Sequence, residues 1–185
     1  MTCVDGAAAP RKIEVRPCRI PHAHLPPELP AKRIVHDLDG IDRPADPHQL
    51  LITGSALWGA WLDHRPGVVP ELLIGLGTTS IIPTIATAIA SGLPYQLAWP
   101  FDRDSDAEAR FRRDAFPAAG RIQGKRVLVV DDHVIHGYTV ASFISALRDE
   151  AADVVGVLCL IEDAEGSARW RVESTGAALC AVHTI

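Results

Sequence analysis

Short apolar runs alternate with helically spaced apolar residues from residue 72 onward. The first such unit starts with the run Leu72–Ile74, which has no polar alternation and is typical of a strand covered on both faces. Four apolar residues then recur at helical spacing: Ile82, Ile85, Ala86 and Ile89. Gly92 and Pro94 are suited to ending a helix, and "YQLAW" follows as a second apolar run. The pattern predicts a β-α-β unit.

A second unit of the same kind begins near Arg126. Val127–Val130 predicts a buried strand, and Val154–Ile161 predicts the strand that follows it. Between them, apolar residues fall at the i, i+3, i+4 and i+7 positions of a helix: Val140, Phe143, Ile144 and Leu147. Two such units predict an α/β fold with a mostly parallel central sheet and helices on both faces.

An amphipathic helix is expected over residues 46–63, before the first unit. Asp46 is suited to the N-cap and Pro47 to the first helical position. The expected apolar stripe consists of Leu50, Leu51, Leu57, Trp58, Trp61 and Leu62. Residues 1–45 are irregular and rich in proline, with possible short strands in "RKIEVRPCRI" and "AKRIVHDL". We therefore divide a single domain into an N-terminal segment, 1–45, and a core, 46–185.

Composition narrows the class of protein. The 185 residues carry a net charge of -5, which argues against a protein that binds nucleic acid through overall electrostatic attraction. No stretch approaches the roughly 20 apolar residues of a membrane span, and the N-terminal residues do not resemble a secretory signal. The cysteines show no C-x-x-C spacing, and Cys159 and Cys180 fall in apolar runs as expected for reduced core residues. We expect a cytoplasmic protein without a membrane or nucleic-acid partner.

Two adjacent aspartates, Asp131 and Asp132, follow the apolar run of the second unit. Neighbouring carboxylates raise each other's pKa and cost free energy unless a cation or hydrogen-bond donor offsets their charge. A response-regulator receiver domain also begins with such a pair, but it needs another acid about forty residues later and several further β-α units. Only 53 residues follow Asp132, so the chain is too short for that interpretation.

The segment "VLVVDDHVIHGYT" instead resembles the phosphoribosyl-pyrophosphate (PRPP) signature of type I phosphoribosyltransferases. The resemblance implies that Asp131 and Asp132 accept hydrogen bonds from the ribose hydroxyls of PRPP, with Mg²⁺ offsetting their repulsion. The following loop opens a helix, whose backbone N–H groups would bind the 5′-phosphate. The loop positions implied in this binding are His136, Gly137, Tyr138 and Thr139.

Other segments extend the likeness over residues 46–185. "GLGTTS" matches the pyrophosphate loop of the family, with Gly77, Thr78 and Thr79 at the matching positions. The polar stretch "FDRDSDAEARFRRDAFPAAG" matches a flexible lid. Its Arg103, Arg112 and Arg113 join the two aspartates as the implied catalytic residues, because arginine can hold pyrophosphate bidentately. The tail most resembles the orotate branch, and residues 1–45 would form the variable hood over the base.

The 5′-phosphate loop departs from the family at two positions. Ile135 stands where a small residue is usual, and His136 replaces a Thr or Ser, although a protonated imidazole can also donate to phosphate. The lid carries arginines where the orotate branch uses lysines. These departures leave the base open between orotate, a purine and an analogue of specialised metabolism.

The resemblance implies a Mg²⁺-dependent transferase that joins a heteroaromatic base to ribose 5-phosphate and releases pyrophosphate. It also implies a homodimer. A non-catalytic PRPP or nucleotide sensor with the same fold is the alternative, and no general base is assigned, since the loop position that is acidic in some relatives is Ile135.

Overall fold

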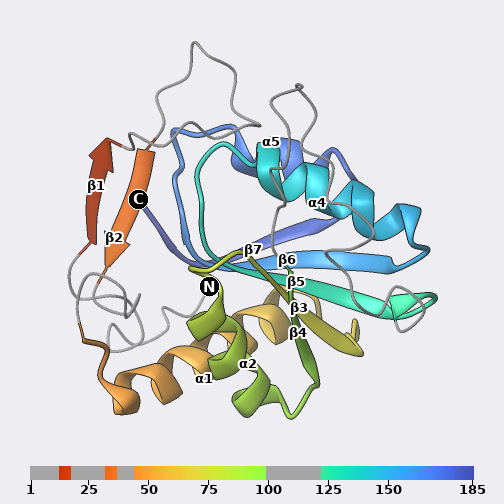
Figure 1. Cartoon of the computed structure of the whole chain (residues 1–185), viewed down its shortest axis with the longest axis horizontal. Helices are drawn as coiled ribbons and strands as arrows, with labels where there is room; N and C mark the ends of the chain where they lie inside the picture. The colour runs from red at the N-terminus through yellow and green to blue at the C-terminus, as the bar shows by residue number, and fades with distance from the viewer. Residues whose placement is uncertain (1–12, 18–31, 37–43, 99–121) are drawn as a thin grey trace.

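A central parallel sheet of five strands organises the chain (Figure 1). The computed structural model describes residues 13–17, 32–36, 44–98 and 122–185. The strand order is β4-β3-β5-β6-β7, and all four neighbouring pairs are parallel. The strands are β3 (Leu72–Leu76), β4 (Tyr95–Ala98), β5 (Arg126–Val134), β6 (Asp153–Glu162) and β7 (Ala178–Thr184). The predicted α/β fold class is confirmed.

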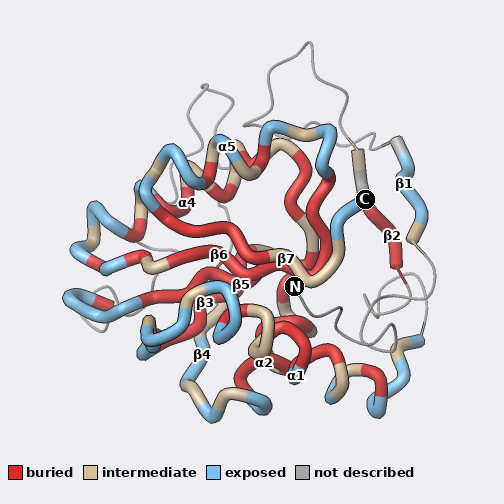
Figure 2. Tube along the Cα trace, turned by 180° about the vertical axis from the view of Figure 1, so that it is seen from behind, coloured by how far each residue is buried: buried red, intermediate tan, exposed pale blue. Residues whose placement is uncertain are grey.

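Helices cover both faces of this sheet. The lower face in Figure 1 carries α1 (Pro47–His64) and α2 (Ile81–Ser91). The upper face carries α4 (Tyr138–Asp149) and α5 (Ala168–Glu173). Figure 2 shows buried residues along the strands between the two helical layers. Because both faces of the sheet are covered, its strands can be continuous apolar runs, which is the pattern from which they were predicted.

A separate two-stranded sheet stands at one end of the molecule. Its strands, β1 (Ile13–Pro17) and β2 (Lys32–His36), pair antiparallel and match the two short strands expected in the first forty-five residues. Ile34 of β2 packs into a buried cluster with Ile135, Leu160 and Ile161 of the core. This small sheet therefore rests on the end of the central sheet where β5 and β6 finish.

The helices α1, α2 and α4 were predicted correctly, and α4 buries the four residues of its expected stripe. In α1, Leu57 and Trp61 are buried as expected, but the rest of the buried face of α1 and that of α2 differ from the expected stripes. Asp46 caps α1 as expected, since its side chain accepts the N–H of His48 at 2.9 Å. Leu51 and Leu62, however, are exposed, and so is Ile89 of α2. The faces that are buried consist largely of small or polar residues: Gln49, Thr53, Gly54, Ala56, Pro83, Thr84, Ala86, Thr87 and Ala88. A Cβ at Gly54 would lie 2.3 Å from the carbonyl oxygen of Ala86, so α1 and α2 pack too closely for larger side chains.

Strand β5 is longer than predicted. It was expected to end at Val130 with the aspartates just beyond it, yet it continues through both of them to Val134. The neighbouring strand β3 pairs with β5 only as far as Val130, whereas β6 continues to pair with it up to Val134. Asp131 and Asp132 therefore lie on a part of β5 that has lost one of its two neighbours.

Within the described ranges, no helix combines the length and apolar character required to span a bilayer. The predicted lid, residues 101–120, lies outside the described residues.

Candidate functional site

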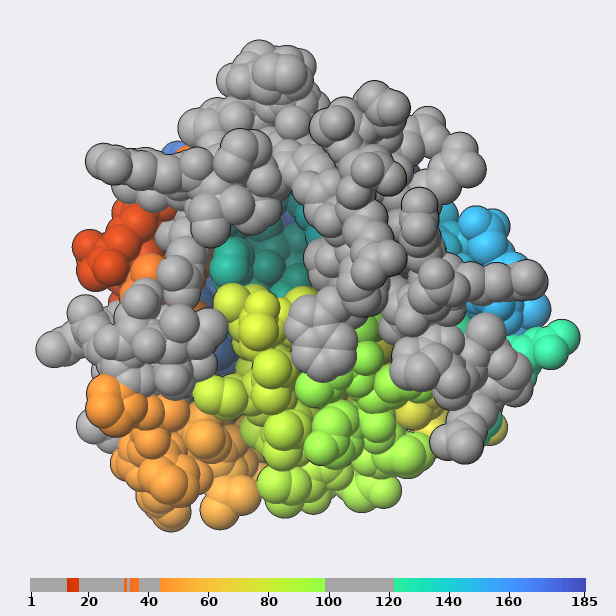
Figure 3. Space-filling model, in the orientation of Figure 1, coloured from red at the N-terminus to blue at the C-terminus, as the bar shows by residue number. Residues whose placement is uncertain are grey.

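Three connections meet at the carboxyl-terminal edge of the central sheet. They are the β3–α2 turn, the β5–α4 loop and the β6–α5 turn, and they share one edge because all five strands are parallel. In Figure 3, the teal surface of the β5–α4 region is set back behind the yellow β3–α2 turn. The predicted binding residues that the structure describes all belong to the first two of these connections, to the end of β5 or to the first turn of α4.

Asp132 forms the polar centre of this edge. Its Oδ1 accepts the Oγ1–H of Thr79 at 2.7 Å, which joins the β3–α2 turn to β5. Its Oδ2 lies 2.7 Å from Nδ1 of His133 and 3.9 Å from Nε2 of His36, which comes from β2. An ionised carboxylate can only accept, so Nδ1 of His133 carries the shared proton. Asp132, at 1% exposure, thus connects three segments that are distant in the sequence.

The two aspartates interact with each other through their carboxyl groups but differ in their other partners. Asp131 pairs in register with Cys159 of β6, and its Oδ1 accepts the backbone N–H of Asp132 at 2.9 Å. Burial raises the pKa of Asp131 well above its usual range, and the charge of Asp132 raises it further. Burial alone would also raise the pKa of Asp132, but the charge and hydrogen bond of His133, with help from His36, lower it well below the usual range.

This pair fits a divalent cation in its chemistry. Neither carboxylate bonds to a Lys or Arg side chain in the described ranges, so a cation could offset the repulsion that raises the pKa of Asp131. Mg²⁺ commonly binds through one or two carboxylates and takes its other ligands from substrate phosphates and water. The described residues contain no group of three or more His, Cys, Asp or Glu side chains that could hold a metal by themselves. The donor set suits a metal that arrives with its substrate.

The loop between β5 and α4 is built for a close backbone approach. Gly137, at the N-cap of α4, has a φ of 75°, a left-handed conformation that a side chain would disfavour. A Cβ there would also lie 3.0 Å from Cα of Ala168. The loop leads directly into the twelve-residue α4, whose first N–H groups and helix dipole favour an anion. The predicted loop residues His136, Tyr138 and Thr139 therefore lie where an anion could be bound.

The structure describes the predicted pyrophosphate-loop residues but not the predicted lid arginines. In the β3–α2 turn, Gly77 donates its N–H to Ala98 O at 2.7 Å, and Thr78 is exposed. Thr79 and Asp132 are joined by the hydrogen bond between their side chains. The predicted Arg103, Arg112 and Arg113 lie outside the described residues. The roles assigned to all these residues stay predictions.

Sequence reasoning missed three groups at this edge. His36 reaches Asp132 from β2, and Lys32 of the same strand pairs with the buried Asp163 at 3.3 Å. Arg171 of α5 donates to His136 O, and its guanidinium stacks on the ring of Tyr138 at 3.6 Å. Each partner is 33 or more residues away in the chain, so no local spacing connects them.

The hydrogen bond between Thr79 and Asp132 gives a direct test of this geometry. We expect Thr79→Val to lower the free energy of unfolding by about 1.5–3 kcal/mol, since the lost bond is made to a charged, buried acceptor. Urea unfolding of the two proteins measures the difference. The neighbouring Thr78 is exposed, so Thr78→Val serves as the control, with a change within about 0.5 kcal/mol. Equal effects of both substitutions would contradict the observed bond.

Comparison with known proteins identifies the family. The family model described as "Phosphoribosyl transferase domain" matches residues 83–176, about half of the chain. The chain is 30% identical over 109 residues to the amidophosphoribosyltransferase of Bacillus subtilis, a match that covers 54% of this chain and 23% of that protein. It is 32% identical over 122 residues to the orotate phosphoribosyltransferase of a Methylobacterium, covering 65% of this chain and 55% of that protein. The chain thus spans a quarter to about half of these two relatives.

A solved structure supports the fold. The orotate phosphoribosyltransferase of Mycobacterium tuberculosis in complex with PRPP superposes with a TM-score of 0.53 at 19% identity. The superposition covers 76% of this chain and 80% of that one. At this identity the likeness establishes the architecture, with the same arrangement of parallel sheet and flanking helices.

Proposed function

Because the chain belongs to the phosphoribosyl transferase domain family, we propose that it is a PRPP-dependent phosphoribosyltransferase acting on a heteroaromatic base. A ring nitrogen of the base forms a bond to C1 of the ribose, and the bond from C1 to the pyrophosphate oxygen breaks. The electron pair of that bond leaves with pyrophosphate, and the proton carried by the ring nitrogen is released to solvent. The products are a nucleoside 5′-monophosphate, or its analogue, and pyrophosphate.

One observation carries this proposal. The hydrogen bond of 2.7 Å between Thr79 and Asp132 holds the β3–α2 turn against the carboxylates of β5, and the α4 loop follows five residues later at Gly137. PRPP has three parts that need three kinds of partner: a pyrophosphate, a diol and a 5′-phosphate. A turn with backbone N–H groups, a pair of carboxylates and a helix N-terminus supply those partners along one edge.

The contribution of the chain to the reaction is orientation and electrostatics. Holding the ribose by its diol and its 5′-phosphate fixes C1 relative to the base, which lowers the entropic part of the barrier. Positive charge develops on the ribose ring as pyrophosphate departs, and the buried carboxylates near the diol favour that charge. Backbone N–H groups of the β3–α2 turn at Thr78 and Thr79 would hold the departing pyrophosphate, and Gly77, whose own N–H is donated to Ala98 O, would let it approach the backbone closely.

We propose that Asp131 and Asp132 hold Mg²⁺ together with PRPP. The metal would offset the charge of the carboxylates and of the pyrophosphate as the latter departs. Asp131 is the better candidate for contact with the diol or the metal, because both oxygens of Asp132 already lie beside donors from the protein. In this arrangement Asp132 also keeps the β3–α2 turn in place.

The remaining parts of the proposal rest on sequence. Residues 101–120 would close over the site and exclude water, with Arg103, Arg112 and Arg113 on the pyrophosphate. Residues 1–45 would form the hood, with core 46–185 beneath it. We also propose a cytoplasmic homodimer. Exposed apolar side chains on successive elements from α1 to β4 are available for its interface, namely Leu62, Val69, Ile89 and Tyr95, and its mass in solution tests the assembly.

The activity is tested by incubating the protein with PRPP, Mg²⁺ and single bases, and measuring pyrophosphate release. We expect release with at least one of orotate, the purine bases or a related heteroaromatic compound, and none without Mg²⁺. Calorimetric titration with PRPP runs beside it. Tight PRPP binding without pyrophosphate release for any base would favour the sensor, and absence of PRPP binding would contradict both functions.

A further inference from the structure

The loop that precedes α4 is held from outside by the β6–α5 region. The backbone N–H of Asp163 donates to Val134 O at 3.1 Å, just before the loop. Gly166 packs on Ile135, and Gly137 packs on the backbone of Ala168. Val134, Ile135 and Gly137 are therefore each in contact with the β6–α5 turn or with the first residue of α5.

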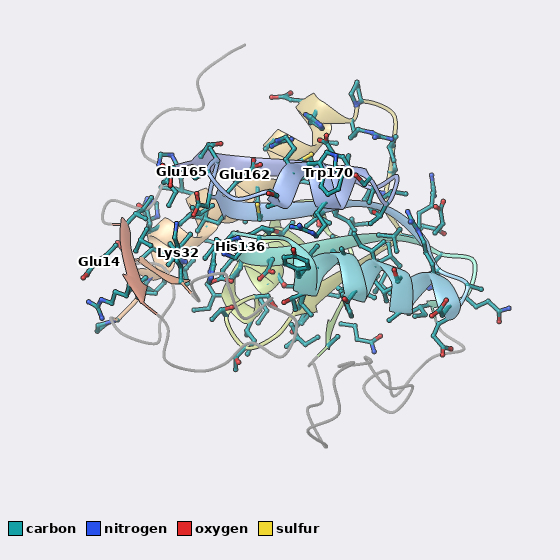
Figure 4. All side chains as sticks on the ribbon, turned by 90° about the horizontal axis from the view of Figure 1, so that it is seen from above. Glu14, Lys32, His136, Glu162, Glu165 and Trp170 are labelled. Carbon is teal, nitrogen blue, oxygen red and sulfur yellow. The ribbon has the colours of Figure 1, made fainter. Side chains whose placement is uncertain are left out.

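Arg171 adds the two side-chain contacts of this support. Its Nη1 donates to His136 O, and its guanidinium carbon lies 3.6 Å from the centre of the Tyr138 ring. A charged donor to a carbonyl and a stacked guanidinium are both stronger than their neutral counterparts. Figure 4 labels His136 at the start of α4 and, on α5, Trp170, the neighbour of Arg171. Arg171 thereby restrains the loop on both sides of Gly137, the residue with the left-handed backbone.

Arg169, two residues earlier on α5, binds different partners from those of Arg171. It donates to Glu162, to Glu173 at 3.2 Å and to Leu179 O at 2.8 Å, so it ties α5 to the sheet. Residues two apart on a helix point in nearly opposite directions, which explains why the two arginines serve different partners. The contact with the loop is therefore particular to Arg171 and is not a general property of a basic helix.

We propose that Arg171 is a positioning residue for the 5′-phosphate loop, a role that rests on the proposed function. It acts through His136 O and the Tyr138 ring, and keeps the loop in the conformation that turns its N–H groups toward the phosphate. The loop departs from its family at Ile135 and His136, and Arg171 supplies a restraint from another element. Ligands with a 5′-phosphate depend on this restraint, whereas pyrophosphate, bound at the β3–α2 turn, does not.

The first measurement needs no ligand. Hydrogen–deuterium exchange of the peptide covering residues 134–140 is compared between the parent protein and Arg171→Ala. We expect exchange of the loop to become about tenfold faster, because a charge-assisted hydrogen bond and a stacking contact are lost together. An unchanged exchange rate would overturn the proposal.

The second measurement is the affinity for three ligands by calorimetry: PRPP, ribose 5-phosphate and pyrophosphate, each with Mg²⁺. Arg171→Ala should weaken PRPP and ribose 5-phosphate about tenfold and leave pyrophosphate unchanged. Unchanged ribose 5-phosphate affinity, or an equal loss for pyrophosphate, would overturn the positioning role. If the parent bound neither PRPP nor ribose 5-phosphate, the proposed function itself would fail, which the parent alone reveals.

Arg148→Ala is the matched control. Arg148 of α4 also donates to a backbone carbonyl, that of Thr175, but this contact lies away from the loop. We expect it to leave the exchange of residues 134–140 and all three affinities unchanged. Thermal melts show whether each variant is folded. Should Arg171→Ala not fold, Arg171→Gln retains a donor for His136 O without the charge, and the same ligand pattern is expected in a weaker form.

Discussion

Replacing Asp131 with asparagine is expected to lower the affinity for PRPP about ten- to a hundredfold while leaving the folded chain at least as stable as before. Hydrogen bonds to a charged group contribute roughly 1.5–3 kcal/mol each, and about 1.4 kcal/mol is a factor of ten in affinity. Asparagine keeps the oxygen that accepts the N–H of Asp132, so the local backbone retains its partner. It removes the charge that the diol and Mg²⁺ would use.

The stability gain of Asp131→Asn should depend on pH in a defined direction. Burial raises the pKa of Asp131 in the folded state above that of the unfolded chain. Ionisation therefore costs the folded state free energy, and the parent loses stability as pH rises from the usual carboxyl pKa through the raised one. The variant is free of this cost. Its advantage should be absent in acid and should grow as pH rises across that window.

Asp132→Asn should behave in the opposite way. The pKa of Asp132 is lowered in the folded state, so its ionised form stabilises the fold above the usual carboxyl pKa, and this contribution is lost as pH falls through the lowered pKa. The amide also offers one oxygen where the carboxylate bonds Thr79 and His133 through two. We expect this variant to be less stable than the parent at neutral pH and to approach it in acid.

Denaturant unfolding across acid to neutral pH, with calorimetry against PRPP and Mg²⁺, measures all of these effects. Asp153→Asn is the control, because Asp153 is exposed and starts β6 at the opposite edge of the sheet. It should change neither quantity. Parent-like PRPP affinity in Asp131→Asn would contradict the assignment of this carboxylate to the ligand. Loss of stability in both aspartate variants would mean that the two residues form one structural unit.

The strands and layers of the fold could be predicted from the sequence wherever a strand is buried on both of its faces. Apolar runs such as Leu72–Ile74 and Val127–Val130 have no polar alternation because helices cover both faces of the sheet, so their presence predicts both the strands and the layers. The buried face of α4 followed from its apolar spacing, whereas the buried face of α2 was harder to predict. Hydrophobicity favoured Ile89 as a buried residue of α2, whereas the close approach of α1 at Gly54 requires small residues there instead.

Those parts of the site that are contiguous in the sequence could be predicted, whereas contacts between distant residues could not. The aspartate pair and the loop with Gly137 are contiguous, and their residue types alone indicate a carboxylate site next to an anion site. The partners that define the roles of these residues are distant. Thr79 is 53 residues from Asp132, and Arg171 is 35 residues from His136. The extension of β5 through the aspartates also depends on pairing with β6, which hydrophobic patterning does not reveal.

Gly166→Ala is expected to have the largest effect on stability, with a loss of about 3 kcal/mol or more. A Cβ at this position would lie 1.8 Å from Ile135 O and 2.7 Å from the carbonyl carbon, both of them backbone atoms that no side-chain rotation can move aside. The β6–α5 turn or the loop must shift, and the same variant should bind ribose 5-phosphate more weakly wherever it still folds.

Gly59→Ala isolates the steric part of this prediction. Gly59 lies in α1, and a Cβ there would meet nothing within 4 Å, so alanine should stabilise the helix by about 0.5–1 kcal/mol. The same chemical change should thus have opposite signs at the two sites, measured by thermal or urea unfolding. A Gly166→Ala protein that unfolds like the parent and binds ribose 5-phosphate equally well would show that the phosphate loop does not depend on the β6–α5 turn. In that case the support of the loop from α5 would rest on Arg171, through His136 O and Tyr138, and on Ala168 against Gly137.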